Sequence, residues 1–559
     1  MTSMHRRTFI LSSAGTASIL SSRMVFANQN LKADIAIIGG GMGGVAAALG
    51  ACRAGSKKVV MTEETTWIGG QMTSQLVPPD EHQFIEGGGS TKTYQQLRND
   101  IRKVYRTRTD KPLTAEGKKI ANLNPGNGWV SRICCEPKVA LDVMEEMLMP
   151  YVSSGQLVIL RQTKAVSADT VGDVVKAVIV ESIDGKQTVI EADYFLDATE
   201  EGDLLPLTNT EFVTGSESKE QTGEPNAADK PRPGNIQSFT YCFVLENCPG
   251  ESHVIDKPKE YDFWMKQRTA EGAPVFQWEK PTPYAFYPLA ARDPAKPERM
   301  NFWTYRRIID QKLFAPGSYK GDVTVVNYHQ NDYALGPSHY GTAEDRARHN
   351  VGARQLSKSF LYWLQTDCPR NDGKTGWPEL RLCPEQTGTE DGIAMSAYIR
   401  ESRRIVPMFR VLQQHVSSDI RIAEMGAAKA RAEEYKDSVG IGLYLYFDIH
   451  KTCEGYSNGG GGKVFPFQIP LGALIPQRVN NLLAACKNLG VTHITNGCYR
   501  LHPTEWNIGE SAGVLAAYCG FKRVSPKQVR ESDTLLKDYQ SKLTDLGVRI
   551  VWPENQLRG

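Results

Sequence analysis

Hydrophobic positions near the start of the chain follow two periods in turn. Residues 33–38 form an apolar, β-branched run, which is typical of a buried parallel strand. Residues 45–52 then place apolar side chains at helical spacing, and Gly55 ends this helix. A second apolar strand, residues 59–61, ends on Glu63. The pattern predicts a strand–helix–strand unit of a parallel sheet.

The loop between this strand and this helix is a cluster of glycines. Gly39, Gly41 and Gly44 have the G-x-G-x-x-G spacing, and Gly40 and Gly43 bring the cluster to five glycines. In that spacing the first glycine allows a tight turn, the second lets backbone approach a pyrophosphate, and the third packs helix on strand. Glu63 follows the last glycine by about 20 residues, where an acid binds ribose hydroxyls. Together these features predict a dinucleotide site; the alternative is a glycine-rich turn without a ligand.

A strand-like period returns after residue 156. Strands are expected at residues 157–160, 174–180 and 189–191, with an Asp184-Gly185 turn between the last two. A further short strand, residues 194–196, ends in Asp197-Ala198-Thr199. A meander that returns to such a strand is how a dinucleotide domain re-enters its parallel sheet. Residues 32–210 are therefore predicted to form the N-terminal part of that domain.

The rest of the chain is predicted to hold an inserted domain and the return to the first one. Residues 211–450 begin with a polar linker and continue as a mixed, aromatic-rich segment, so we expect an α+β substrate or cap domain. Residues 451–525 contain an apolar strand, a loop and a helix over 512–518, which the Asn507–Glu510 spacing places after a capping box. Residues 526–559 form a C-terminal extension.

Two arginine-rich segments, residues 95–108 and 400–404, follow helical patterns. The first is expected to expose a solvated basic face. The second is expected to form ion pairs at i, i+3 and i, i+4 spacing, and substrate contact by its arginines is the alternative.

Composition limits the function classes. The 559 residues leave room for two or more domains. Lys and Arg number 65 against 63 Asp and Glu, a net charge of +2, so no nucleic acid or other polyelectrolyte partner is implied. The sequence has no run of 18 apolar residues, so no membrane span is predicted in the mature chain.

Residues 1–27 are predicted to be an export signal. Arg6-Arg7 before Phe9 resembles the twin-arginine signal, although His5 stands where serine or threonine is usual. A weakly apolar segment follows, and Val25-Phe26-Ala27 offers small residues for cleavage. We therefore expect a periplasmic or secreted protein that is exported folded. An ordinary secretory signal and a disordered tail are the alternatives.

The eleven cysteines show no CxxC and no zinc-like spacing, so no metal site is predicted. Export permits disulfides, and Cys368 with Cys383 or Cys242 with Cys248 are conceivable pairs. Most are expected to be buried free thiols.

Seven motifs along the chain are distinctive: ADIAIIGGGMGG, TEETTWIGGQ, YFLDATEEGDLL, YIRESRRI, PLGALIP, NLLAACKNLG and NIGESAG. Together they resemble the motifs of the FAD-dependent oxidoreductases of the glutathione-reductase-like superfamily, which are distantly akin to fumarate reductase flavoproteins. The resemblance implies an α/β fold: a Rossmann-like FAD-binding domain with a three-layer ββα sheet and a β-meander, plus the inserted domain. The combination is specific for FAD and not for a substrate.

The resemblance also implies which residues hold FAD. Gly509, Glu510 and Ser511 would present helix N–H groups to the flavin N1–C2=O edge and stabilise the negative charge of the reduced flavin. Cys486-Lys487 departs from the pattern, because relatives usually have glycine at the first of these positions. The other implied contacts are Gly39, Gly41, Gly43 and Gly44 to the pyrophosphate, Glu63 to the adenosine ribose, and Gly69, Gly70, Asp197, Ala198 and Thr199 along the cofactor.

Flavin takes up hydride, so protein groups must position the substrate and move its proton. His502 is the first candidate for the base, and Arg500 for an anion clamp or acid. His493, Glu505 and His82 are further candidates. For each histidine the alternative is a satisfied structural residue.

We therefore expect an oxidoreductase, a dehydrogenase or oxidase, that removes hydride from a small organic substrate. One alternative is an accessory flavoprotein that oxidises a partner protein during its maturation. Another is a FAD-binding sensor without turnover.

Nicotinamide binding is not expected. Residues 456–463 place four glycines before a lysine, but Ser457 and Val464 replace residues that a phosphate-binding P-loop requires. A second strand–GxGxxG–helix unit does not occur in the sequence. Electrons are therefore expected to pass to oxygen, a quinone or a small redox carrier rather than to NAD(P).

Overall fold

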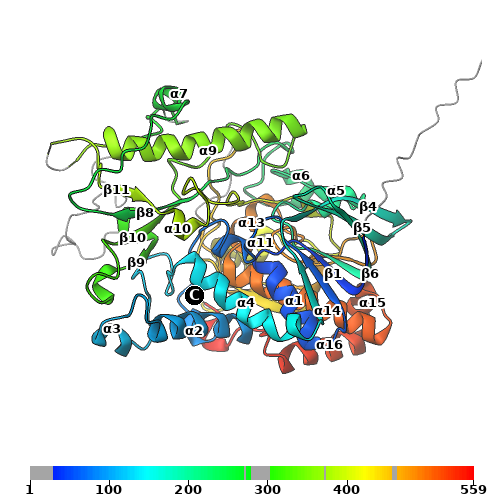
Figure 1. Ribbon diagram of the computed structural model, residues 1–559. Coiled ribbons are helices and arrows are strands. Elements are labelled where there is room, and N and C mark those ends of the chain that lie inside the picture. Colours follow the sequence, from blue (N-terminus) through cyan, green and yellow to red (C-terminus); the bar gives the residue numbers. More distant parts are fainter. Residues whose placement is uncertain (1–28, 270–271, 278–301, 371–372, 456–461, 559) are drawn as a thin grey trace, which may run out of the picture.

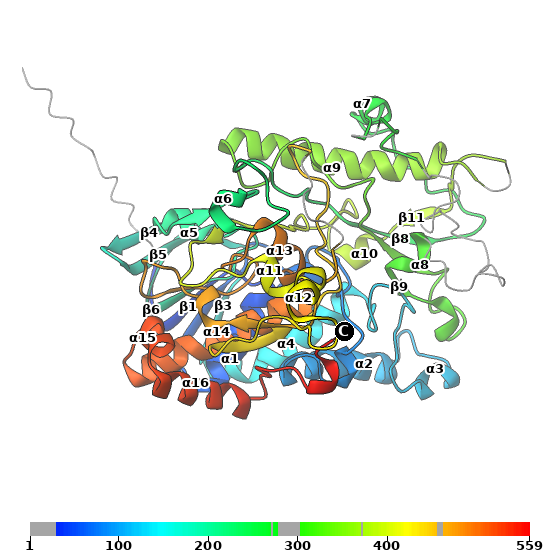
Figure 2. The same ribbon diagram turned by 180° about the vertical axis from the view of Figure 1, so that it is seen from behind.

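The computed structural model describes residues 29–269, 272–277, 302–370, 373–455 and 462–558. The predicted signal peptide and most of the glycine run at 459–462 lie outside the described residues. The chain forms a large sheet with its helices and a smaller sheet below the long helix α9 (Ala343–Thr366), which spans the top of both views (Figure 1, Figure 2).

A seven-stranded sheet lies at the centre of the larger part. Its order is β3-β2-β1-β6-β5-β4, and β15 pairs with the second half of β6. The β3-β2-β1-β6-β15 pairings are parallel, whereas β4, β5 and the first half of β6 form an antiparallel meander. The strands are β1 Gln29–Ile38, β2 Val59–Thr62, β3 Leu157–Leu160, β4 Thr163–Val171, β5 Val174–Ser182, β6 Gln187–Asp197 and β15 Leu482–Ala484. The predicted α/β class with a Rossmann-like sheet and a meander is confirmed.

Two helices lie backbone to backbone beside this sheet. Helix α1 (Met42–Ala54) connects β1 to β2, and α14 (His502–Lys522) packs against it. A Cβ atom on Gly509 would overlap the carbonyl of Gly43. Because glycine lets the two backbones touch, the start of α14 is held beside the glycine loop. Helix α4 (Pro137–Ser153) contacts α1 and β3 in the same group (Figure 1).

The smaller part is an antiparallel sheet in the order β11-β8-β10-β9. An aromatic core that includes Trp264, Phe360 and Trp363 fills the space between this sheet and α9. The strands are β8 Phe243–Asn247, β9 Arg307–Ile309, β10 Val323–Val326 and β11 Leu380–Leu382. These elements all fall within the segment predicted to be an inserted α+β domain; the exact domain boundaries remain predictions.

The other elements are smaller or peripheral. Among the described residues, no helix is long and apolar enough to cross a membrane. The remaining helices are α2 Lys92–Thr107, α3 Ala115–Lys119, α5 Leu204–Leu207, α6 Lys219–Thr222, α7 Tyr261–Lys266, α8 Phe302–Tyr305, α10 Pro384–Thr387, α11 Gln413–Val416, α12 Ser418–Met425, α13 His493–Tyr499, α15 Pro526–Glu531 and α16 Asp533–Asp545, and two small sheets pair β7 Phe212–Val213 with β12 Arg404–Ile405 and β13 Ser438–Gly442 with β14 Phe467–Pro470.

Besides the start of α14, which is described below, three regions differ from the predicted elements. Strand β4 was not expected, since its half-exposed residues are mostly polar or small and lack the apolar run of a buried strand. Residues 493–499 form helix α13 rather than a loop, and Thr492 caps it by accepting a hydrogen bond from the Thr495 N–H. Residues 400–403 are irregular rather than helical.

In both charged segments, several arginines are buried in ion pairs. Arg98 and Arg102 bind Glu86 instead of forming a solvated face. Arg400 binds Asp332, far away in the sequence, and Arg404 binds Glu217. Only the Arg404–Glu401 pair has the predicted i, i+3 spacing. Buried arginine needs such partners, because an unpaired buried charge is costly.

All eleven cysteines are free, so the two conceivable disulfides are wrong. Ten of them are buried, which agrees with their expected role as small apolar side chains.

Candidate cofactor and substrate site

The glycine loop turns from β1 into α1 as the spacing predicts. Gly39 has a φ of +104°, a conformation that favours glycine, and its N–H donates to Thr62 Oγ1 at 3.1 Å. A Cβ on Gly39 would overlap the backbone of Ala198, and one on Gly44 would overlap Gly39. At Gly41, by contrast, the three nearest atoms to an added Cβ all belong to side-chain carboxylates. Of these three glycines, Gly41 is therefore the one whose Cβ side faces carboxylate side chains rather than backbone.

A second glycine pair lies against this loop. The Gly69 N–H donates to the Gly40 carbonyl at 2.7 Å. Gly70 has a φ of +45°, and a Cβ there would lie 2.9 Å from the Cα of Gly41. The two glycine segments thus form one backbone-lined wall.

Two acids at strand ends flank the loop. Glu63 follows β2, and its Oε1 accepts hydrogen bonds from the Thr65 N–H and Oγ1 at 2.8 and 2.7 Å. Asp197 ends β6, where its Oδ1 accepts from the N–H and Oγ1 of Thr199 at 3.1 and 2.7 Å. Burial raises the pKa of each carboxyl to about 7.

Gly509, Glu510 and Ser511 do not lie at a helix N-terminus, which corrects the prediction. Helix α14 begins at His502 with Pro503 in its first turn, so these three residues lie two turns inside it. Glu510 binds Arg53 at 2.9 Å and Thr93 at 2.5 Å, and Ser511 donates to the Val439 carbonyl at 2.8 Å. They fasten α14 to its neighbours.

The expected capping box is likewise absent. The Asn507 side chain instead accepts a hydrogen bond from the Ile441 N–H at 3.1 Å.

The first turn of α14 brings a buried ion cluster to the glycine loop. Lys487, fully buried after β15, binds Glu200 and lies 3.2 Å from Glu505. Glu505 Oε1 accepts from the Gly43 N–H at 3.2 Å. Burial lowers the pKa of Lys487, but Glu200 and Glu505 outweigh burial and raise it, so the lysine is charged.

A second cluster of charged side chains is connected to the first through the side chain of Gln71. Gln71 joins the two, since its Nε2 donates to Glu505 at 2.5 Å and to the Arg500 carbonyl at 3.1 Å. Arg500 donates to the Tyr398 hydroxyl and to Asp448, each at 2.7 Å. Part of the Arg500 guanidinium, which was predicted to clamp a substrate anion, is therefore already bound to protein groups.

Arg306 and Asp80 complete this cluster. Arg306 Nη1 lies 3.3 Å from Asp80 Oδ1, and its Nε has no partner among the described residues. Both side chains are buried, at 8% and 5% exposure. Burial raises the pKa of Asp80, and Arg306 offsets this only in part. The cluster combines an arginine with spare donors and a carboxyl that holds its proton more tightly than usual.

His502 contacts Asp80 through the backbone. Its Nδ1 accepts the Asp80 N–H at 3.1 Å, and its Nε2 lies 3.1 Å from the Val77 carbonyl. Burial lowers its pKa to about 3, so the ring is neutral. Both nitrogens are therefore engaged in fixing the loop that carries Asp80.

The other two histidines lie in separate environments. His493 Nδ1 is 3.0 Å from both oxygens of Glu401. Burial raises the pKa of Glu401, but His493 and Arg404 outweigh burial and hold this pKa at about 2. His82 packs 5.6 Å from the Trp552 ring and bonds the Gly89 carbonyl, and burial lowers its pKa to about 4.

Residues 34–543 match the sequence model of a family described as FAD dependent oxidoreductase. The chain belongs to this family. It is thus an oxidoreductase with FAD as its cofactor. No curated protein matches the chain.

The solved structures that match the chain do so with low sequence identity and low TM-scores. The FrdA subunit of E. coli quinol fumarate reductase is 10% identical with a TM-score of 0.31, and the match covers 92% of this chain and 74% of that one. L-proline dehydrogenase from P. horikoshii is 19% identical with a TM-score of 0.17, over 34% of this chain and 24% of that one. The myxobacterial FAD-dependent halogenase CndH is 13% identical with a TM-score of 0.21, over 39% and 44%. The chain thus matches about a quarter of the dehydrogenase and under half of the halogenase.

The residues around the glycine loop fit FAD. The side of Gly41 that a Cβ would fill is free of backbone, as a bound diphosphate requires. The first turn of α1 has no acidic residue and no side-chain cap from its N-cap residue Gly41, although Glu505 on α14 accepts the Gly43 N–H. Glu63 stands at the end of the neighbouring strand, where the adenosine ribose binds in such folds.

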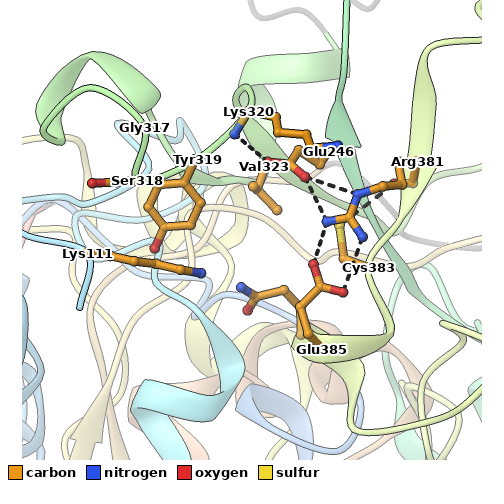
Figure 3. Close-up of a pocket in the computed structure, with 11 residues that line it drawn as sticks. Lys111, Glu246, Gly317, Ser318, Tyr319, Lys320, Val323, Arg381, Cys383 and Glu385 are labelled. Atoms are coloured by element: carbon orange, nitrogen blue, oxygen red, sulfur yellow. Dashed lines mark hydrogen bonds and ion pairs between the residues drawn. The ribbon is translucent and has the colours of Figure 1, made fainter. Parts of the chain in front are cut away.

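Two further groups of polar side chains lie close together, away from the glycine loop. His329, Asp332 and His450 place ligand atoms within 4.8 Å of one another, but Arg400 and Thr240 already bind Asp332. The other group lines a cavity of about 220 Å³ in the smaller part. There Arg381 forms ion pairs with both Glu246 and Glu385 (Figure 3).

Sequence reasoning missed Asp80, Arg306, Tyr398 and Asp448, although it named Arg500. No motif marks them, because they come from four segments that meet only in the folded chain. It also singled out Lys487 only as a departure, and did not weigh Glu200. The available signal was a charged residue that follows the apolar end of each strand: Glu200 after β6 and Lys487 after β15.

Proposed function

We propose that this FAD-dependent oxidoreductase removes hydride from a small organic acid that binds between Arg306 and Asp80. The observation that carries the proposal is the buried Arg306, with one carboxylate partner and an unpartnered Nε among the described residues. Guanidinium groups bind carboxylates through two parallel N–H donors. A second anion, that of a substrate, would therefore find donors already positioned.

The roles of the residues follow from their contacts. FAD, when bound, accepts the hydride. Arg306 binds and orients the substrate carboxylate, and Asp80 accepts the proton that leaves the substrate. Arg500 holds the Tyr398 hydroxyl and Asp448 in place. His502 anchors the backbone of Asp80 and keeps its own ring neutral.

The burial of the pair supports a small substrate. With Arg306 and Asp80 at most 8% exposed, a side chain on a folded partner protein would have difficulty reaching them. No contact in the structure favours the alternative of a flavoprotein that matures a partner protein.

An anaerobic screen of flavin bleaching tests the proposal. Hydroxy acids and amino acids are compared with their methyl esters and with plain alcohols, amines and sugars. We expect bleaching by at least one free acid and at least tenfold slower bleaching by its ester. Arg306→Gln should remove that difference, whereas Arg381→Gln, the paired arginine of Figure 3, should keep it. Bleaching only by neutral substrates would contradict the proposal.

We further propose that the electrons leave to oxygen, a quinone or a small redox carrier. The support is that the sequence offers one dinucleotide fingerprint, which FAD uses. Oxidised protein should then not be bleached by NADH or NADPH, and substrate-reduced protein should be reoxidised by a quinone analogue or oxygen. Bleaching by a nicotinamide at the rate of turnover would contradict this.

Export by the twin-arginine route to the periplasm or medium is also proposed, on the basis of Arg6-Arg7. Replacing both with lysine should leave folded, FAD-loaded protein in the cytoplasm, as measured by cell fractionation. Undiminished export would favour the general secretory route.

A further inference from the structure

Two carboxylates face the wall formed by the two glycine segments, where the FAD diphosphate would bind. Glu505 Oε1 accepts the Gly43 N–H at 3.2 Å, in the first turn of α1. Glu200 Oε1 has no partner among the described residues, and it is the nearest atom to an added Cβ on both Gly41 and Gly70. Both oxygens thus lie on the ligand side of the glycine wall.

One lysine serves both carboxylates. Lys487 binds Glu200 Oε2 and lies 3.2 Å from Glu505 Oε2, and its side chain is fully buried. Gln71 donates a further hydrogen bond to Glu505. Two glutamates and one lysine leave a net charge of −1, if both glutamates are ionised. The FAD diphosphate brings two more negative charges to the same wall.

Uptake of a proton at this wall would offset one of these negative charges. A neutral carboxyl removes one negative charge and gains an O–H donor, which a phosphate oxygen accepts. Glu200 has the geometry for this exchange, since one of its oxygens keeps the lysine while the other faces the loop without a partner.

We propose that FAD binding is coupled to the uptake of one proton from solvent by the Glu200–Glu505 pair. The proton stays on Glu200, whose O–H donates a hydrogen bond to the diphosphate. The proposal rests on FAD being the cofactor and does not depend on the identity of the substrate. Other titratable groups near the pair are Glu63 and Glu64 after β2, Asp197 at the end of β6, Cys486 beside Lys487, and His502 on α14.

The dissociation constant of FAD across pH 6 to 9 tests the proposal. It is measured by the fluorescence of released flavin on dilution of the FAD-loaded, full-length protein. The affinity of the wild type should fall as pH rises, approaching about tenfold per pH unit, the limit for one proton. Glu200→Gln keeps an acceptor for Lys487 and supplies an N–H toward the loop. This variant should bind FAD with little pH dependence and at least tenfold more tightly than the wild type at pH 9.

Matched variants separate this explanation from others. Glu145→Gln, on the outer face of α4, should retain the wild-type slope. Glu505→Gln should reduce the slope as well, which keeps the test open if Glu200→Gln does not fold; circular dichroism and the Tm report folding. A flat wild-type affinity, an unchanged slope in both glutamine variants, or loss of the slope in Glu63→Gln instead would each overturn the proposal.

Discussion

The glycine loop and the Arg306 cluster are built in opposite ways. The loop is six consecutive residues, 39–44, and five of them are glycines. Its function depends on backbone conformation and on the absence of side chains at these glycines. The cluster consists of side chains from residues as far apart as Asp80 and Arg500, held together by the packing of the smaller part on the larger one. The first is specified locally and the second only by the whole fold.

The difference implies that cofactor binding and substrate chemistry can be lost separately. Gln71 connects them, since its side chain donates to Glu505 beside the loop and to the Arg500 carbonyl in the cluster. Glycine variants should therefore act on folding or FAD content, and variants of the cluster should act on turnover in protein that remains fully loaded with FAD.

The largest effect is expected for Gly509→Val. A side chain here would overlap the Gly43 carbonyl and push α14 away from α1. Overpacking of this kind costs about 3 kcal/mol or more. We expect little soluble protein and a Tm lowered by many degrees. Gly520→Ala, on the same helix with its nearest neighbour 3.9 Å away, is the control and should change neither. A Tm for Gly509→Val within a few degrees of wild type would contradict the close helix contact.

Gly41→Val should separate the folded state from the cofactor. An added Cβ meets only carboxylate side chains, which can move, so the protein should fold. The side chain would nevertheless fill the space of the diphosphate, and FAD affinity should fall by about 100-fold or more. Flavin absorbance of the purified protein and its far-ultraviolet circular dichroism measure the two properties. A flavin content like that of wild type would refute the role of Gly41.

The same contrast explains what the sequence could predict. β1, α1, β2 and the FAD loop follow from local patterns, because strand burial, helix period and glycine spacing are all properties of neighbouring residues. The start of α14 was misplaced because Asn507 and Glu510 have the spacing of a cap, while tertiary packing on α1 extends the helix back to His502. The Arg306–Asp80 pair joins residues 226 apart in sequence, and no local pattern reports such a contact.

Asp80→Asn should have the largest effect on chemistry alone. Burial raises the pKa of Asp80. Its carboxylate, the form that accepts a proton, therefore appears as pH rises through this raised pKa. Flavin reduction by the acid substrate should therefore speed up with pH in the wild type. In the variant this rise should vanish and the rate should fall by about 10²- to 10⁴-fold. Stopped-flow absorbance measures it, and an unchanged pH profile would assign the base elsewhere.

Arg306→Lys should affect binding more than chemistry. Lysine keeps the charge but loses the paired, planar donors that match a carboxylate. We expect KM for the acid substrate to rise about 10- to 100-fold with a smaller fall in kcat, a loss of about 1.4 to 2.7 kcal/mol. FAD content should not change. An equal loss in kcat with KM unaffected would indicate that Arg306 acts in the chemical step rather than in substrate binding.

The smallest effect on chemistry is expected for His502→Asn, which decides between the base predicted from sequence and the one that the structure favours. His502 is neutral, with a pKa near 3, so it does not titrate between pH 5 and 9. The asparagine oxygen can still accept the Asp80 N–H, while the Val77 carbonyl loses its partner at a cost of about 1–3 kcal/mol of stability. We expect a lower Tm, less than a tenfold change in the rate of flavin reduction, and the same pH inflection as wild type. If the inflection disappears in His502→Asn and persists in Asp80→Asn, the proton acceptor is His502.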